Sequence, residues 1–159
     1  MEKILLRIYS SKKASTSLKI ISHASVIISV ISYAIILFLT YRIDAWNAAY
    51  TLIFSAIPFI IVTAVRKLIN APRPYELYVF YKIPPKEKKG QSFPSRHVFS
   101  AFLIATLAIP TSIPLSAALF TVGICLSVSR VLLGMHFIRD VTAGALIGII
   151  SGILGIIII

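Results

Sequence analysis

The stretch from Val98 to Ser129, VFSAFLIATLAIPTSIPLSAALFTVGICLSVS, contains no charged residue. At 32 residues it is longer than the roughly 20 apolar residues that one helix needs to cross a bilayer. Pro110 and Pro114 bracket the sequence PTSIP near its middle. Proline removes a helical hydrogen bond and favours a turn, so the stretch predicts two spanning helices, near 98–112 and 114–129, joined by a tight hairpin.

The rest of the chain is similarly apolar. Hydrophobic residues make up 58% of it, and the mean hydropathy is +0.93. Charged residues are only 13%, which is about half of their usual share in soluble domains. Further uncharged runs predict spans near 20–40, 48–65 and 141–159. We therefore expect an all-α, polytopic transmembrane bundle of about five spans, forming a single domain over residues 1–159.

The first nineteen residues do not fit a span, because they contain Lys3, Arg7, Lys12, Lys13 and Lys19. Burying a cation in hydrocarbon costs about 2.5 kcal/mol or more. Residues 1–19 are therefore predicted to form an amphipathic segment on the membrane surface.

The net charge of +11 indicates an anionic partner. Nucleic acid does not fit, because the basic residues are not gathered on a soluble module. The hydropathy favours a membrane surface, and an anionic substrate is a further partner of matching charge.

The last predicted span contains Gly144, Gly148 and Gly152, which the spacing of four places on one helical face. Small residues at this spacing allow helices to approach closely in lipid. Two uses of this face stay open: a homodimer interface, or packing against a neighbouring helix of a monomeric chain.

Outside the N-terminal segment, most polar residues fall in three short segments: RKLINAPRP (66–74), SFPSRH (92–97) and SRVLLGMHFIRD (129–140). Segment 66–74 follows the predicted span near 48–65, and segment 92–97 precedes the span near 98–112. Segment 129–140 lies between the spans near 114–129 and 141–159. An arrangement of five spans therefore places all three segments on the same side of the membrane.

The residue types in these segments are those that phosphate chemistry uses. Guanidinium groups match phosphate oxygens in a bidentate way, and helix N-termini bind anions. Asp140 follows His136 by four residues, so its carboxylate can accept a ring N–H and leave the other ring nitrogen as a nucleophile. The predicted phosphoryl-transfer site consists of His97, His136, Asp140, Ser95, Arg66, Arg73, Arg96 and Arg130. The alternative is that the arginines anchor the topology and the histidines are satisfied locally.

A metal site is not expected. The chain has five acidic residues, no cluster of them with histidine has ligand spacing, and four arginines would repel a divalent cation. We therefore expect neither a catalytic metal nor another cofactor.

The three segments resemble the motifs of the type 2 phosphatidic acid phosphatase superfamily, K-x6-R-P, P-S-G-H and S-R-x5-H-x3-D. The third motif matches in full, from Ser129 to Asp140. The second reads Pro-Ser-Arg-His, with Arg96 in place of glycine, and the first has Arg66 in place of lysine, with Lys67 as the adjacent alternative. The resemblance covers about residues 20–159.

The resemblance implies a role for each matched residue. His136 would attack phosphorus and become a phosphohistidine, Asp140 would orient it, and His97 would protonate the leaving alkoxide and then activate water. The phosphate oxygens would be held by Arg66, Arg73, Ser95 and Arg130. Arg96 would reach the lipid headgroup or a second phosphate.

The expected function is metal-independent removal of phosphate from a lipid phosphate or diphosphate. Candidate substrates are phosphatidylglycerophosphate, phosphatidate and polyprenyl phosphates or diphosphates. The alternatives are a non-catalytic lipid-phosphate binder or carrier, and a phosphatase for a soluble ester. The distribution of Lys and Arg predicts that the active site lies on the cytoplasmic face of the cell membrane, although many relatives work on the outer face.

Overall fold

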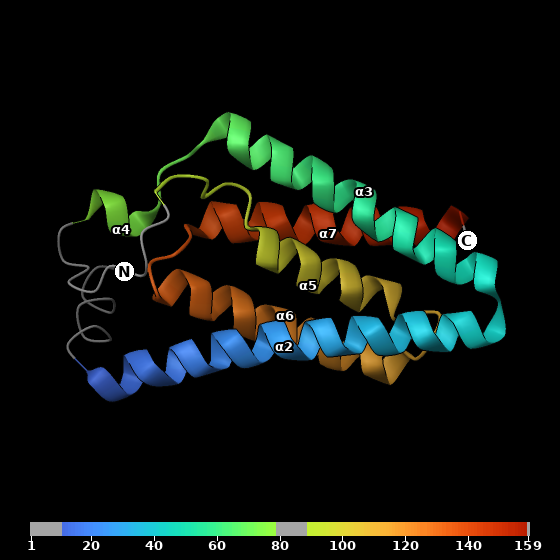
Figure 1. Cartoon of the computed structure of the whole chain (residues 1–159). Helices are drawn as coiled ribbons and strands as arrows, with labels where there is room; N and C mark the ends of the chain where they lie inside the picture. The colour runs from blue at the N-terminus through green and yellow to red at the C-terminus, as the bar shows by residue number, and fades with distance from the viewer. Residues whose placement is uncertain (1–10, 79–88, 159) are drawn as a thin grey trace.

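The computed structural model describes residues 11–78 and 89–158, and the regular structure in these residues is helical. Figure 1 shows long helices lying side by side, with the chain reversing direction between them. The helices are α2 (Lys12–Ile43), α3 (Ala45–Ile69), α4 (Pro74–Leu77), α5 (Arg96–Leu107), α6 (Ile113–Leu132) and α7 (Ile138–Ile158). Four of them, α2, α3, α6 and α7, are long and apolar enough to cross a membrane. The predicted all-α membrane bundle is confirmed.

Helix α2 begins earlier than predicted. Ser11 caps it by accepting a hydrogen bond from the Ala14 N–H, and the helix then continues without a break to Ile43. No glycine or proline interrupts these 32 residues, so the part of the predicted surface segment from Lys12 to Lys19 belongs to this helix. At 1.5 Å per residue the helix is about 48 Å long, more than the roughly 30 Å of a hydrocarbon core. Residues 1–10 of the predicted surface segment lie outside the described residues.

One face of α2 is lined with serines and packs inside the bundle. The buried residues of this helix are Ser15, Ser22, Ser25, Ser29, Ser32 and Ile36. Small side chains allow the close contact of α2 with α6, and the Ser29 hydroxyl is satisfied by the carbonyl of Ser25. The opposite face exposes large apolar side chains such as Ile27 and Ile31, as expected of a surface that faces lipid.

Short polar caps make the reversals between the helices. Asp44 alone separates α2 from α3, and its carboxylate accepts the Trp46 N–H at 3.1 Å. Ser112 caps α6 in the same way, accepting the Leu115 N–H. Pro114 lies in the first turn of α6 rather than in the hairpin, because proline is tolerated where the N–H would have no helical partner.

Helix α5 is shorter than its predicted span near 98–112. Its 12 residues rise by about 18 Å, which is less than the thickness of the hydrocarbon core. The helix contacts α2, α3, α6 and α7, and Val98, Phe99 and Ala105 have no exposed surface. A helix that is apolar all round is stable when it is enclosed by others, and α5 forms the centre of this bundle.

The glycine face of α7 contacts α5. A Cβ atom at Gly144 would lie 2.6 Å from the Ser95 carbonyl oxygen, and one at Gly148 would lie 2.5 Å from that of Phe99. At Gly152 it would lie 2.5 Å from the Thr106 Cβ. These contacts match the predicted packing within one chain. Helix α5 therefore occupies this glycine face, and the oligomeric state of the protein stays a prediction.

Candidate active site

The three polar segments meet at one end of the bundle (Figure 1), beside the C-termini of α3 and α6 and the N-termini of α5 and α7. They enclose a cavity of about 510 Å³. Six of the eight predicted site residues line it: Arg66, Arg73, Arg96, His97, Arg130 and His136. The other two, Ser95 and Asp140, are fully buried beside it. The remaining lining residues are Lys19, His23, Thr63, Tyr75, Gln91 and Met135.

His136 lies in the connection between α6 and α7, not on a helix. Gly134 has a φ of 63°, a left-handed conformation that turns the chain back after α6. The histidine ring is 2% exposed, and its Nδ1 lies 3.7 Å from the Asp140 Oδ2. That separation is too long for a hydrogen bond. The predicted direct bond on one helical face is therefore corrected: α7 begins only at Ile138, after the histidine.

Asp140 is held at the start of α7. Its Oδ2 accepts the Phe137 N–H at 2.9 Å, which is half of a capping box, and the N-terminus of the helix favours its negative charge. Its Oδ1 has no hydrogen-bond partner among the described residues, although the Arg139 Nε lies 3.6 Å away. The carboxylate thus orders the turn that carries His136.

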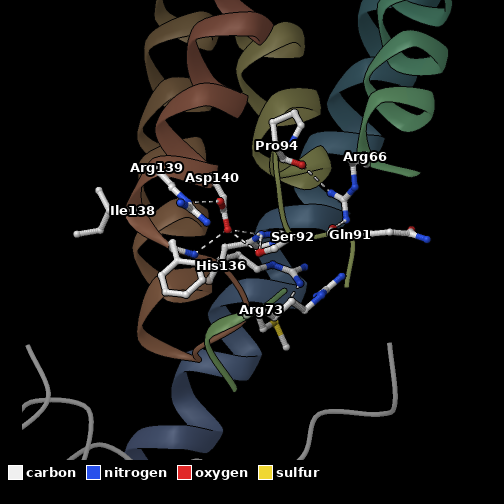
Figure 2. A network of polar contacts seen from close by, with 12 residues as sticks. Arg66, Arg73, Gln91, Ser92, Pro94, His136, Ile138, Arg139 and Asp140 are labelled. Atoms are coloured by element: carbon white, nitrogen blue, oxygen red, sulfur yellow. Dashed lines mark hydrogen bonds and ion pairs between the residues drawn. The ribbon is translucent and has the colours of Figure 1, made fainter. Parts of the chain in front are cut away.

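Ser92 contacts both of these residues, and the sequence prediction did not include it. Figure 2 shows its hydroxyl beside the Asp140 carboxylate. The Ser92 Oγ lies 2.5 Å from the Asp140 Oδ2 and 3.4 Å from the His136 Nδ1. The only sequence signal was its place in the second polar segment, because the residue belongs to none of the three motifs.

Ser95 immediately precedes α5, but its side chain does not cap the helix. Its main-chain N–H donates to the Asp140 carbonyl at 2.9 Å, which joins α5 to α7. Its hydroxyl is buried and has no hydrogen-bond partner among the described residues. The hydroxyl therefore remains able to bond a substrate oxygen.

Arg66 and Arg73 line the cavity and also hold its wall. Arg66 is 8% exposed, and its two terminal nitrogens donate to the carbonyls of Pro94, at 2.9 Å, and Gln91 (Figure 2). The Arg73 Nε donates to the Gly90 carbonyl at 2.9 Å. The forked shape of guanidinium lets one side chain join two carbonyls, which an ammonium group does less well.

Arg96 and Arg130 contribute the other two cationic groups. The Arg96 guanidinium lies 5.3 Å from the centre of the Phe59 ring on α3, a cation–π contact at the wall of the cavity. The Arg130 Nη1 donates to the Met135 sulfur at 3.2 Å, and its Nε has no hydrogen-bond partner among the described residues. Both side chains therefore keep donors for an anion.

The electrostatic environment favours a neutral His136. Burial lowers the pKa of His136 below its ordinary value, and the charges of Arg73 and Arg66 lower it further, whereas the nearby Asp140 carboxylate opposes the change. A neutral imidazole has a free ring nitrogen, and the surrounding guanidinium groups attract anions. Among the described residues no group of three or more His, Cys, Asp or Glu could hold a metal ion.

The sequence profile of the PAP2 superfamily matches residues 44–159, which is more than half of the chain. The chain belongs to the PAP2 superfamily. No curated protein shows a significant match. The fold of this PAP2 protein is similar to the crystal structure of LpxE from Aquifex aeolicus, with a TM-score of 0.72 and 24% identity over 97% of this chain and 93% of that one.

A second similar structure is the transmembrane PAP2-type phosphatidylglycerolphosphate phosphatase from Bacillus subtilis. Its TM-score is 0.62 at 19% identity, over 98% of this chain and 90% of that one. Together with the apolar helices, these findings identify the chain as a multi-pass membrane protein of a phosphatase family.

Proposed function

We propose that this PAP2 protein hydrolyses a phosphate group from a membrane lipid phosphate or diphosphate through a phosphohistidine intermediate. A neutral, buried His136 shares an arginine-lined cavity with His97, and this pairing supplies a nucleophile and an acid–base group. Phosphoryl transfer depends mainly on positioning and on charge stabilisation, and four guanidinium groups provide both.

In the first step the His136 Nε2 attacks phosphorus, and the P–O bond to the lipid breaks as His97 gives its proton to the leaving alkoxide. Burial, and the charges of Arg130 and Arg96, lower the pKa of His97 to about 3 before substrate binds. The negative phosphate of the bound substrate acts in the opposite direction and favours the protonated form that this step uses. In the second step His97 takes a proton from water, whose oxygen attacks phosphorus, and the P–N bond breaks. Inorganic phosphate and neutral His136 result.

The observation that carries the lipid assignment is an apolar continuation of the site. A cavity of about 230 Å³ shares Arg96 and His97 with the polar cavity. A further cavity, of about 300 Å³, shares four lining residues with the cavity of about 230 Å³: Val30, Phe59, Ser100 and Ile104. Together they extend from the guanidinium groups along α2, α3 and α5. An acyl or prenyl chain would fit there, and a soluble ester would leave the surface unused.

The test is a panel of phosphatidate, phosphatidylglycerophosphate, polyprenyl diphosphate and glycerol phosphate, scored in detergent by the inorganic phosphate released. We expect release from at least one lipid to exceed that from glycerol phosphate by tenfold or more. Faster release from glycerol phosphate would favour the soluble-ester alternative. Binding of a lipid phosphate without release would favour the carrier alternative.

The same assay tests the absence of a metal from the mechanism. We expect activity to survive an excess of chelator, and vanadate to inhibit as a mimic of the transition state. Loss of activity on chelation, with recovery on adding magnesium, would contradict the histidine mechanism.

We also propose that the cavity faces the cytoplasm. If the spans alternate in direction, fifteen of the sixteen Lys and Arg residues of the sequence would lie on the side of the cavity and Arg42 on the other. Four of the fifteen, Arg66, Arg73, Arg96 and Arg130, belong to the site and are discounted, and the remaining excess agrees with the positive-inside rule. A cytoplasmic site would favour phosphatidylglycerophosphate or phosphatidate, which an enzyme can meet on the inner leaflet.

A further inference from the structure

Ser92 has the geometry of a link between the nucleophile and its carboxylate. The serine has no exposed surface, and its Oγ lies within hydrogen-bond distance of the Asp140 Oδ2, at 2.5 Å, and within a weaker 3.4 Å of the His136 Nδ1. The direct path between the His136 Nδ1 and the Asp140 Oδ2 is longer, at 3.7 Å. The hydrogen-bonded connection between the two residues therefore runs through the serine hydroxyl.

The single hydroxyl proton determines the direction of these bonds. A carboxylate can only accept, so Ser92 must donate its proton to Asp140. The Phe137 N–H and the α7 N-terminus favour the ionised carboxylate in this position. With its proton used, the Ser92 oxygen can only accept from the His136 Nδ1. That nitrogen then carries the ring proton, and Nε2 is left with a free lone pair.

Ser92 is itself held in place by the rest of the site. Its main-chain N–H donates to the Ala71 carbonyl at 2.9 Å, between α3 and α4. Arg66 binds the carbonyls of Gln91, just before the serine, and of Pro94, two residues after it. The first polar segment thus fixes the hydroxyl that the nucleophile contacts.

We propose that Ser92 is a positioning residue that selects the Nδ1-protonated tautomer of His136 and so directs Nε2 to the phosphorus. The expected effect of Ser92 on the rate of phosphate release rests on the proposed function, whereas its effect on the tautomer of His136 does not. When the ring becomes positive in the phosphohistidine, the same hydroxyl transmits the stabilising charge of Asp140 to it.

The direct test is the ¹⁵N spectrum of histidine-labelled protein in detergent near pH 7.5, with His136→Asn used to assign the signals. We expect a protonated Nδ1 and an unprotonated Nε2 in the unmodified protein. Ser92→Ala should give a mixture of both tautomers. A protonated Nε2 in the unmodified protein, or an unchanged spectrum in Ser92→Ala, would overturn the proposal. The spectrum of the unmodified protein decides the question even if Ser92→Ala does not fold.

The kinetic test compares Ser92→Ala with Ser116→Ala. Ser116 is also buried, but its hydroxyl donates to the Ala105 carbonyl, at the far end of the bundle. A misoriented nucleophile typically loses about 100-fold in rate. We expect such a loss of kcat with little change in KM for Ser92→Ala, and near-normal kcat for Ser116→Ala. Equal losses in both would overturn the positioning role. If no lipid phosphate is hydrolysed but Ser92→Ala changes the tautomer of His136 as expected, the proposed function is wrong. The proposal that Ser92 selects the tautomer is then still supported.

Discussion

His136 is the residue on which the proposed reaction depends. We expect His136→Ala to abolish phosphate release, because loss of a covalent nucleophile leaves only the small rate from binding and charge stabilisation. Thr121→Ala is a matched control, since Thr121 is exposed on α6 and its hydroxyl donates to the Ala117 carbonyl within the same helix. Release by His136→Ala within tenfold of the unmodified rate would show that another group attacks phosphorus.

The lowered pKa of His136 predicts a particular pH dependence. A histidine of ordinary pKa, about 6.5, is only about one quarter neutral at pH 6. Because burial lowers the pKa of His136, its neutral form persists below that range, and phosphohistidine formation should not decline between pH 7.5 and pH 6. The measurement is a single-turnover reaction with labelled substrate, stopped with alkali to preserve the intermediate. A fourfold decline at pH 6 would mean that the environment does not favour the neutral ring.

Arg66 replaces the lysine of the family motif. Its guanidinium group donates to two carbonyls at once, which explains why arginine suits this position. Arg66→Lys should leave one of these carbonyls without a partner, at a cost of about 1–3 kcal/mol in stability. We expect a lower unfolding temperature in detergent and a slower reaction. Lys67→Arg, which changes the adjacent exposed residue, is the control. Equal unfolding temperatures for Arg66→Lys and the unmodified protein would mean that the guanidinium does not hold the loop.

Packing between helices α5 and α7 places Ser95 beside Asp140 and brings His97 to the cavity that His136 lines. Gly148→Ala would put a Cβ atom 2.5 Å from the Phe99 carbonyl oxygen and 3.0 Å from the Leu103 nitrogen, and neither backbone atom can move without moving α5. We expect a lower unfolding temperature and a loss of activity, measured on the same detergent preparation.

Gly155→Ala provides the contrast on the same helix. Its new Cβ atom would meet the Leu107 side chain at 3.2 Å, and a flexible side chain can adjust. Alanine also improves helix propensity by about 1 kcal/mol. This variant should be as stable as the unmodified protein or more so. Equal destabilisation at both positions would show that the close approach of the two helices does not limit stability.

For the whole molecule, the proposed cytoplasmic position of the cavity predicts which end of α2 is accessible from outside the cell. Single cysteines at Ser11 and Ala45, in a Cys125→Ser background, mark the two ends of α2, and both positions are exposed. With a membrane-impermeant thiol reagent on intact cells, we expect Ala45→Cys to be labelled and Ser11→Cys to be labelled only after permeabilisation. The reverse pattern would place the cavity outside and make a polyprenyl diphosphate the first candidate substrate.

The sequence by itself determined the helical class, the presence of several long apolar segments and the convergence of the polar ones. These follow from one physical constraint: a backbone in hydrocarbon must satisfy its own hydrogen bonds, so apolar runs of sufficient length become helices. Once the helices alternate in direction, 66–74, 92–97 and 129–140 must lie at the same end. Motif spacing added the candidate residues, because each motif is short enough to be read locally.

Only the tertiary structure decided how these residues meet. The contacts of the Ser92 hydroxyl with His136 and Asp140 join residues more than forty positions apart. The hydrogen bonds by which Arg66 holds the cavity wall go to the carbonyls of Gln91 and Pro94, which lie 25 and 28 residues away in the sequence. The packing of Gly144, Gly148 and Gly152 against α5 was one of two uses that the spacing allowed. A local sequence pattern indicates which face of a helix is buried. Which residues pack against that face depends on the packing of the whole bundle.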